Sequence, residues 1–349
     1  MRIALDAMGS DNAPQTELLG LTEALQEFDD LQISLFGKKE ILVNPESTIS
    51  NDRFEIVDTN DAIGMHEAPS EVLKTKPNSS IALAIKSIKE KKADAMVSAG
   101  NTGAVMAFAM ALLGTIPGID RPALAAPFPT PKGNTLMVDI GANVNAKPTN
   151  LYQFAVMGSI AASYIFKKAN PTVGLLNIGK EEKKGTEISQ TSYKLLSESE
   201  LNFIGNIEGQ DVLKGACDVI VCDGFVGNVI LKFGEGMAEI ISEMLEEYLS
   251  SESKYRLRRW FSKPVLGEFI SRWSYEEYGG ALLLGVKGTV IIGHGRSTAK
   301  AMKNAIKTAI YAAQGRTTEH IEEKFKSQFL KSETLNLIQG RVQDKTQDL

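Results

Sequence analysis

Short apolar runs recur along this chain, most of them closed by glycine, aspartate or asparagine, and the stretches between them have helical hydrophobic spacing. Nine such runs are predicted strands: residues 2–7, 32–37, 54–59, 94–100, 134–141, 172–179, 202–207, 218–224 and 289–295. Strands that alternate with helices are typical of a largely parallel sheet covered by helices on both faces. The pattern therefore predicts an α/β protein.

Polar residues close these runs, and ligands of parallel sheets bind beyond the carboxyl ends of the strands. Aspartate and asparagine also favour turns and helix caps, so each residue alone is weak support for a site. We expect the set to share one location at the carboxyl ends of the strands. Its members are Asp6, Gly9, Asp11, Ser98, Asn101, Asp139, Asn143, Asn177, Glu208, Asp223, Asn228 and His294.

Two strand-to-helix turns match each other, at residues 93–105 (ADAMVSAGNTGAV) and 217–229 (CDVIVCDGFVGNV). Their glycines let backbone N–H groups approach a ligand, and each following helix directs its partly positive N-terminus to the same place. One such turn often serves backbone geometry alone, but a matched pair favours an anion site, most plausibly for phosphate. The predicted phosphate-binding residues are Ser98, Gly100, Asn101, Thr102, Gly103, Gly224, Gly227 and Asn228.

Motifs of several common enzyme classes are missing from the sequence. There is no G-x-G-x-x-G dinucleotide turn, no G-x-x-x-x-G-K-[ST] phosphate loop, no G-x-S-x-G nucleophile elbow and no H-E-x-x-H zinc motif. Residues 293–295 (GHG) come nearest to the dinucleotide turn but lack its third glycine. The sequence therefore disfavours NAD, ATP and serine-hydrolase chemistry.

Composition narrows the location and the partners. The 349 residues are 43% hydrophobic and carry a net charge of -5, so no basic excess is available for general nucleic-acid binding. The start, MRIALDAMGSD, has no apolar signal region, and the longest apolar stretch, residues 104–113, is far shorter than the roughly 20 residues that span a bilayer. We expect a cytosolic protein. Cys217 and Cys222 are spaced for opposite faces of one strand, which predicts buried thiols.

A basic, aromatic segment occupies residues 254–273 (KYRLRRWFSKPVLGEFISRW). Six basic residues and one acid give it a local charge of +5, and Pro264 and Gly267 divide it into two short helices. Three interpretations can coexist: an arm at a subunit interface, an amphipathic contact with an anionic membrane, and a docking patch for an acidic protein. The residues expected to make these contacts are Arg256, Arg258, Arg259, Trp260, Phe261, Lys263 and Trp273.

A long ordered set of motifs covers residue 1 to about residue 315: IALDAMGSDNAP (3–14), KPNSS (76–80), VSAGNTGA (97–104), GIDRPALA (118–125), DIGANVNAKP (139–148), GLLNIGKEEKKG (174–185), FIGNIEG (203–209), CDGFVGNV (222–229), YGGALLLGVKG (278–288) and HGRS (294–297). With these motifs the chain closely resembles the bacterial acyl carrier protein:phosphate acyltransferases of the PlsX type. It departs from them at Ser10, where the family usually has a second glycine.

The resemblance implies reversible transfer of a long-chain fatty acyl group from acyl carrier protein to inorganic phosphate, which gives acyl phosphate for phospholipid synthesis. It implies a three-layer α/β/α sandwich with a mostly parallel sheet, similar to isocitrate and isopropylmalate dehydrogenases and to phosphotransacetylases. It also implies a cytoplasmic homodimer that works beside the membrane, in contact with anionic lipid or with a membrane glycerol-phosphate acyltransferase. No metal or organic cofactor is implied. Residues 1–335 would form one catalytic unit with the helical arm inserted at about 245–275, followed by a polar tail at 336–349.

Phosphate is itself the nucleophile in that reaction, so no serine or cysteine has to attack. The two turns suit a dianion and the thioester oxyanion, and Lys184, Lys287 or Arg296 would add positive charge. His294 is the candidate proton donor for the leaving thiolate, with a structural loop histidine as the alternative. Asp223 would orient a donor or act as base in the reverse direction, with a helix cap as the alternative. The candidate catalytic residues are His294, Asp223, Asn228 and Lys184.

An apolar trench is needed for the acyl chain. Met106, Phe108, Met110 and Leu113, on the helix after the first turn, are candidate walls, although helical spacing suits plain core packing as well. An acyl-enzyme on Cys222 is a weaker alternative to direct attack by phosphate.

Three other functions stay open at this point. A CoA-dependent phosphotransacetylase would accept free CoA and a short-chain acyl phosphate. A metal-dependent decarboxylating dehydrogenase of the same fold would bind NAD. A membrane-surface scaffold without catalytic activity would depend on the basic segment and tolerate changes in the turns.

Overall fold

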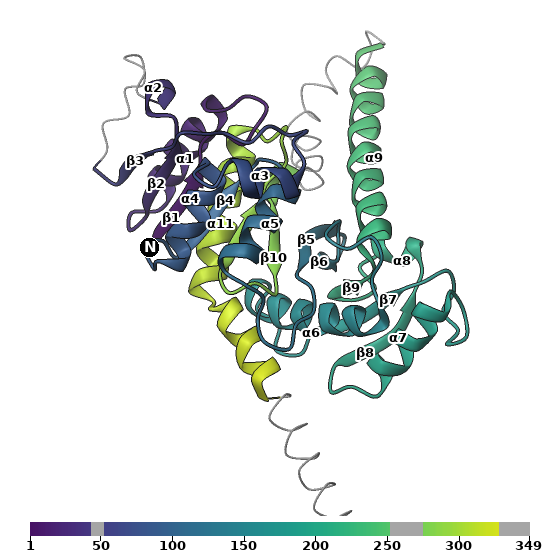
Figure 1. Cartoon of the computed structure of the whole chain (residues 1–349). Coiled ribbons are helices and arrows are strands. Elements are labelled where there is room, and N and C mark those ends of the chain that lie inside the picture. The colour runs from purple at the N-terminus through teal and green to yellow at the C-terminus, as the bar shows by residue number, and fades with distance from the viewer. Residues whose placement is uncertain (43–51, 252–274, 328–349) are drawn as a thin grey trace, which may run out of the picture.

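An 11-stranded sheet runs through the centre of the protein in this computed structural model, which describes residues 1–42, 52–251 and 275–327 (Figure 1). The strand order is β3-β2-β1-β4-β11-β10-β5-β6-β9-β7-β8. The strands are β1 (Arg2–Asp6), β2 (Gln32–Gly37), β3 (Phe54–Asp58), β4 (Ala95–Ser98), β5 (Ala123–Thr130), β6 (Gly133–Val138), β7 (Thr172–Leu176), β8 (Asn202–Ile207), β9 (Val219–Val221), β10 (Ala281–Leu284) and β11 (Thr289–Ile292).

Helices cover both faces of this sheet, as a three-layer sandwich requires (Figure 1). They are α1 (Gln15–Glu27), α2 (Lys39–Leu42), α3 (Pro69–Thr75), α4 (Ser80–Lys89), α5 (Thr102–Leu112), α6 (Pro148–Ile165), α7 (Glu187–Ser197), α8 (Gly209–Leu213), α9 (Gly224–Ser251) and α11 (Ala299–Gln314), with a short 3-10 helix at Tyr275–Glu277. Among the described helices, none has both the length and the apolar character that a membrane crossing requires.

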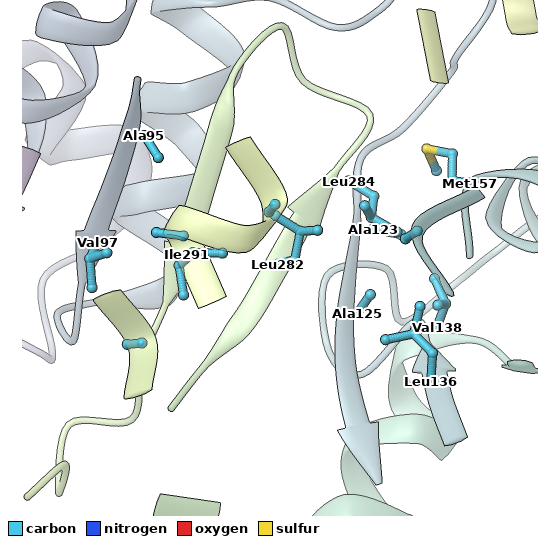
Figure 2. Close-up of a cluster of buried hydrophobic side chains, with 14 of the residues drawn as sticks. Ala95, Val97, Ala123, Ala125, Leu136, Val138, Met157, Leu282, Leu284 and Ile291 are labelled. Carbon is cyan, nitrogen blue, oxygen red and sulfur yellow. The ribbon is translucent and has the colours of Figure 1, made fainter. Parts of the chain in front are cut away.

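Alternation along the strands divides the core into two layers. Val97 of β4 and Val138 of β6 pack into the cluster that includes α1, α6 and α11, whereas their neighbours Met96 and Met137 pack into the cluster with α4, α5 and α8. Figure 2 shows the first layer crossing adjacent strands from Val97 to Val138. The mostly parallel α/β/α sandwich expected from the sequence is thus confirmed.

All nine strands predicted from the apolar runs are present, but two more were missed, β5 and β10. β5 contains Pro127 and Pro129, and proline within a run argues against a sheet interior. β10 is a four-residue apolar run, ALLL, with no alternation to identify it.

These two missed strands reverse the direction of the sheet. β10 pairs antiparallel with both β11 and β5, and β5 pairs antiparallel with β6. β4 and β11 therefore run opposite to β6 and β9, which are parallel to each other. The expectation that all carboxyl ends share one edge is wrong, because it assumed a sheet without this reversal.

The two cysteines flank β9 rather than lie in it. Cys217 and Cys222 are both buried and free, as predicted, and they belong to the same core layer. Their expected position on opposite faces of one strand is therefore wrong.

Helix α9 is long and extends beyond the body of the protein (Figure 1). It begins at Gly224, within the second turn, and ends at Ser251, so it includes the start of the arm expected at about 245–275. The basic, aromatic residues expected at 256–273 and the tail at 336–349 lie outside the described residues.

A buried carboxyl group of α1 holds the loop after β1. Glu17 is fully buried, and its Oε1 accepts the Ser10 N–H at 3.0 Å, which fixes the position where the sequence departs from the family that it resembles. Burial is the main cause that raises the pKa of Glu17 from 4.5 to about 7, and the hydrogen bond from Ser10 acts against it.

We expect Glu17 to make the protein less stable as the pH rises from 4.5 to about 7. In that window the folded state keeps a proton that the unfolded chain has released. The contribution of Glu17 to the free energy of unfolding is therefore full below pH 4.5 and is lost as the pH rises to about 7. The difference amounts to about 3 kcal/mol. Glu17→Gln keeps an oxygen for Ser10 and cannot ionise, so its free energy of unfolding in urea should lack this fall. Glu23→Gln, at an exposed position of the same helix, is the control. Identical pH profiles for Glu17→Gln and wild type would contradict the buried, protonated state.

Candidate active site

The first turn is held by its own side chains. Asn101 caps α5, since its Oδ1 accepts the Ala104 N–H at 3.0 Å. Its amide also donates to the carbonyls of Gly64, Met65 and Glu67 at 2.9 to 3.2 Å. Asn101 therefore pins the segment 64–67 to the turn.

A buried aspartate lies beneath this turn. Asp6, at the end of β1, accepts the Ser98 hydroxyl at 2.6 Å and the Met8 N–H at 3.1 Å. Ser98 Oγ in turn accepts the Gly100 N–H at 3.0 Å. Burial raises the pKa of Asp6, while the hydrogen bond from Ser98 opposes that change. Ser98 is thus a link between a buried carboxyl group and the turn.

The second turn rests on an equivalent aspartate, Asp139, just after β6. Its fully buried carboxyl group accepts five hydrogen bonds of 2.7 to 3.1 Å: from the N–H groups of Leu124, Gly141, Ala142 and Asn143 and from the Asn143 amide. These hydrogen bonds tie residues 139–143 to one buried carboxyl group.

Helix α9 starts against this loop. The Gly224 N–H donates to the Asn143 carbonyl at 2.8 Å, and a β-carbon at Gly227 would lie 1.9 Å from the Asp139 carbonyl oxygen. Asp223 Oδ1 accepts the Val226 N–H at 3.0 Å, so Asp223 makes the helix-cap contact that was its structural alternative. These residues set the direction in which α9 leaves the sheet.

A pocket of about 430 Å³ lies where the two turns approach each other across β5. Its apolar lining includes Leu124, Ala126 and Phe128 of β5 with Ile140 and Leu231. Its polar lining includes Asp11, Thr102, Asn228, Lys232, Glu235 and His294. The pocket therefore offers charged and apolar surfaces side by side.

The surroundings of His294 favour the neutral form of its imidazole. Burial is the first cause that lowers its pKa below 6.5, and the positive charges of Arg296 and Lys232 add to the effect. Its Nδ1 accepts the Arg296 N–H at 3.1 Å, so the proton of the neutral ring is on Nε2. Across the pocket, burial raises the pKa of Glu235, and the charge of Arg296 opposes this.

The structure brings four of the predicted site residues together in the pocket lining: Gly100, Thr102, Asn228 and His294. The predicted Ser98, Asn101, Gly103, Asp223, Gly224 and Gly227 belong to the two turns but are outside that lining, and Arg296 adjoins it through His294. Lys184 is exposed in the loop after β7, where its carbonyl accepts the Asn177 amide. The Lys287 N–H donates to the carbonyl of Gly114, which follows the C-terminal end of α5; Thr102 is at the other end of that helix.

Sequence reasoning missed Lys232 and Glu235, two charged residues of the pocket. They follow Asn228 by four and seven residues, which places all three on one face of a helix. That spacing after the second turn was the available signal.

The residues expected to wall an acyl trench lie outside this pocket. None of Met106, Phe108, Met110 and Leu113 lines the pocket, and Phe108 is buried in the core. The apolar lining comes instead from β5, which the sequence did not reveal as a strand. Cys222 is buried, and its thiol points to the Asp139 carbonyl; burial holds its pKa well above 9.0, so the acyl-enzyme alternative loses support.

Within the described ranges, no group of three or more histidine, cysteine, aspartate or glutamate side chains is placed to hold a metal ion.

Comparison with known proteins gives a consistent picture. A family model described as "Fatty acid synthesis protein" matches residues 1–319. The phosphate acyltransferase of Heliobacterium modesticaldum is 48% identical over 326 residues, which are 93% of this chain and 97% of that protein. That of Halothermothrix orenii is 46% identical over 314 residues, covering 88% of this chain and 94% of the relative.

Solved structures of low sequence identity share the fold. A phosphotransacetylase from Streptococcus pyogenes aligns with a TM-score of 0.56 at 18% identity, covering 90% of this chain and 94% of its own. One from Staphylococcus aureus aligns with a TM-score of 0.54 at 16% identity and the same coverage. At this identity the likeness concerns the fold alone.

Proposed function

Since the chain belongs to the fatty acid synthesis protein family, whose relatives are phosphate acyltransferases, we propose that it transfers a long-chain acyl group from acyl carrier protein to inorganic phosphate. The product would be an acyl phosphate for phospholipid synthesis. The observation that carries the proposal is the pocket itself, in which hydrogen-bond donors and a lysine adjoin an apolar surface on β5. The reaction needs both surfaces side by side, because the phosphate oxygen has to reach the carbonyl carbon of a thioester whose acyl chain is apolar.

Phosphate would bind at the polar side of the pocket. Thr102 begins α5, whose first N–H groups have no acceptor within the helix and whose dipole favours an anion. Lys232 and Asn228 face the same pocket from α9 and would add a positive charge and an amide donor. This arrangement holds a dianion between two helices that the buried aspartates have fixed in place.

Acyl transfer would need no enzyme nucleophile. A phosphate oxygen attacks the thioester carbonyl carbon, the carbon–sulfur bond breaks, and its electron pair leaves with sulfur. The proton of hydrogen phosphate ends, in net terms, on the thiol of acyl carrier protein, so charge and atoms balance.

His294 would stabilise the oxyanion in this step. Because its pKa is lowered, the ring is mostly neutral at pH 7 and offers an Nε2–H hydrogen bond rather than a stored proton. A neutral donor keeps that hydrogen bond available throughout the neutral pH range. Its role as proton donor to the thiolate stays a prediction.

The first experiment is thiol release from palmitoyl acyl carrier protein, with hydroxylamine trapping of acyl phosphate. We expect release only when inorganic phosphate is present. Acetyl-CoA serves as the comparison substrate, because a phosphotransacetylase would prefer it. Release from acetyl-CoA alone, or release without phosphate, would overturn the proposed reaction.

Asn228→Ala should raise the KM for phosphate about ten- to a hundredfold, since a lost hydrogen bond to a charged ligand is worth about 1.5–3 kcal/mol. The KM for palmitoyl acyl carrier protein should stay near that of wild type. Asn170→Ala makes the same change at an exposed position and is the matched control. Unchanged phosphate kinetics in Asn228→Ala would remove the second turn from the phosphate site.

We also propose that the protein is a homodimer that uses α9. Seven apolar side chains, each at least 42% exposed, follow one face of this helix at spacings of three and four residues: Phe225, Val229, Phe233, Met237, Ile240, Met244 and Tyr248. A stripe of this length on one helix is typical of a helix-to-helix contact. The basic segment that follows would let such a dimer rest on an anionic membrane in the cytoplasm.

Phe233→Lys should convert the dimer to a monomer, because it places a charge in the middle of the stripe, where Phe233 is 67% exposed. Sedimentation at micromolar protein concentration measures the mass. Leu19→Lys changes a residue of similar exposure on α1 and should leave the mass unchanged. A dimer that survives Phe233→Lys would exclude this face as the contact.

A further inference from the structure

Helix α9 and strand β5 pack against each other at a glycine. A β-carbon built on Gly234 would lie 2.9 Å from Cε2 and 3.0 Å from Cζ of Phe128. Gly234 and Phe128 both line the pocket, and Phe128 is buried from solvent. The ring therefore occupies the space that any side chain at position 234 would need.

At the polar end of the pocket, the loop after β6 contacts both the same helix and the same strand. Gly141 lies beside Asn228, since a β-carbon on Gly141 would be 3.8 Å from Asn228, and the Ile140 N–H donates to the Leu124 carbonyl. From Asn228 to Gly234 the helix rises about 9 Å, and from Leu124 to Phe128 the strand advances about 13 Å. The apolar lining thus runs from the predicted phosphate ligand Asn228 toward the contact between Gly234 and Phe128.

Backbone geometry does not require glycine at position 234. The φ angle of Gly234 is not positive, so its backbone conformation is open to other residues. Glycine in a helix interior also lowers stability by about 1 kcal/mol relative to alanine. Gly236, two residues further along α9, has open space around its would-be β-carbon. The requirement at position 234 is therefore for space beside Phe128.

We propose that the contact between Gly234 and Phe128 is the end stop of the acyl pocket and sets the longest chain that the enzyme accepts. The proposal rests on the proposed acyl transfer and names the residues that select its substrate. With glycine at 234, the ring packs closely against the helix backbone as part of the pocket wall. A larger residue there would either fill the end of the pocket itself or push the ring further into it.

Gly234→Ala should therefore shift the chain-length preference. We expect the ratio of kcat/KM for palmitoyl over octanoyl acyl carrier protein to fall about tenfold, as for a hydrophobic pocket shortened by a methylene. Gly236→Ala adds the same methyl group and the same helix propensity in open space, so its ratio should equal that of wild type. If both variants shift the ratio equally, the cause is the stiffer helix and the proposal fails.

Phe128→Leu provides the reciprocal test, because leucine lacks the Cε2 and Cζ atoms that the new β-carbon would meet. Its ratio should exceed that of wild type, and Gly234→Ala combined with Phe128→Leu should return toward the wild-type ratio. A double variant that remains as restricted as Gly234→Ala would overturn the end stop.

Binding separates this proposal from the reaction on which it rests. Calorimetry with octyl, dodecyl and hexadecyl phosphonates measures chain-length dependence without turnover. If wild type lacks phosphate-dependent thiol release but Gly234→Ala loses affinity for hexadecyl phosphonate only, the reaction is wrong and the end stop stands. If turnover is normal and neither measurement depends on position 234, the end stop is wrong and the reaction stands.

Discussion

Two buried carboxyl groups, those of Asp6 and Asp139, determine the shape of everything that surrounds the pocket. A carboxyl group without access to water has to be met by hydrogen-bond donors inside the protein. Here the donors are the serine, asparagine and backbone N–H groups of the loops themselves. The loops therefore have one conformation, and the two helices that follow them start at fixed points.

These hydrogen bonds explain why few of the loop residues that the sequence singled out face the pocket. Ser98, Asn101 and Asp223 satisfy buried or capping positions, while Thr102, Asn228 and His294 are carried to the pocket by the structure beneath them. Groups fixed in this way lose little conformational freedom when a dianion binds, because they do not have to reorganise during the reaction. Burial and the positive charges of Arg296 and Lys232 lower the pKa of His294 and so favour its neutral form.

Helix α9 contributes to two features of the protein. Its inner face, through Asn228, Leu231 and Gly234, forms a wall of the pocket, and its outer face carries the exposed apolar stripe. Because one helix serves both, a subunit contact along the stripe would stiffen the pocket wall and hold the end stop at Phe128 in place. In the proposed dimer, the same helix would therefore connect the proposed acyl pocket with the neighbouring subunit.

The sequence by itself determined the α/β class, nine of the strands, the two glycine turns and the helices that follow them, because local apolar runs, turn residues and helix caps are properties of neighbouring residues. It also indicated that Asn228 and His294 lie at strand and helix ends. Only the tertiary structure decided how these pieces converge. Two short strands, β5 and β10, reverse the direction of the sheet, and their pairing joins residues more than a hundred positions apart. With that reversal the pocket lies across the face of β5 rather than along a shared carboxyl edge, and its apolar lining comes from a proline-containing strand that no local pattern could identify.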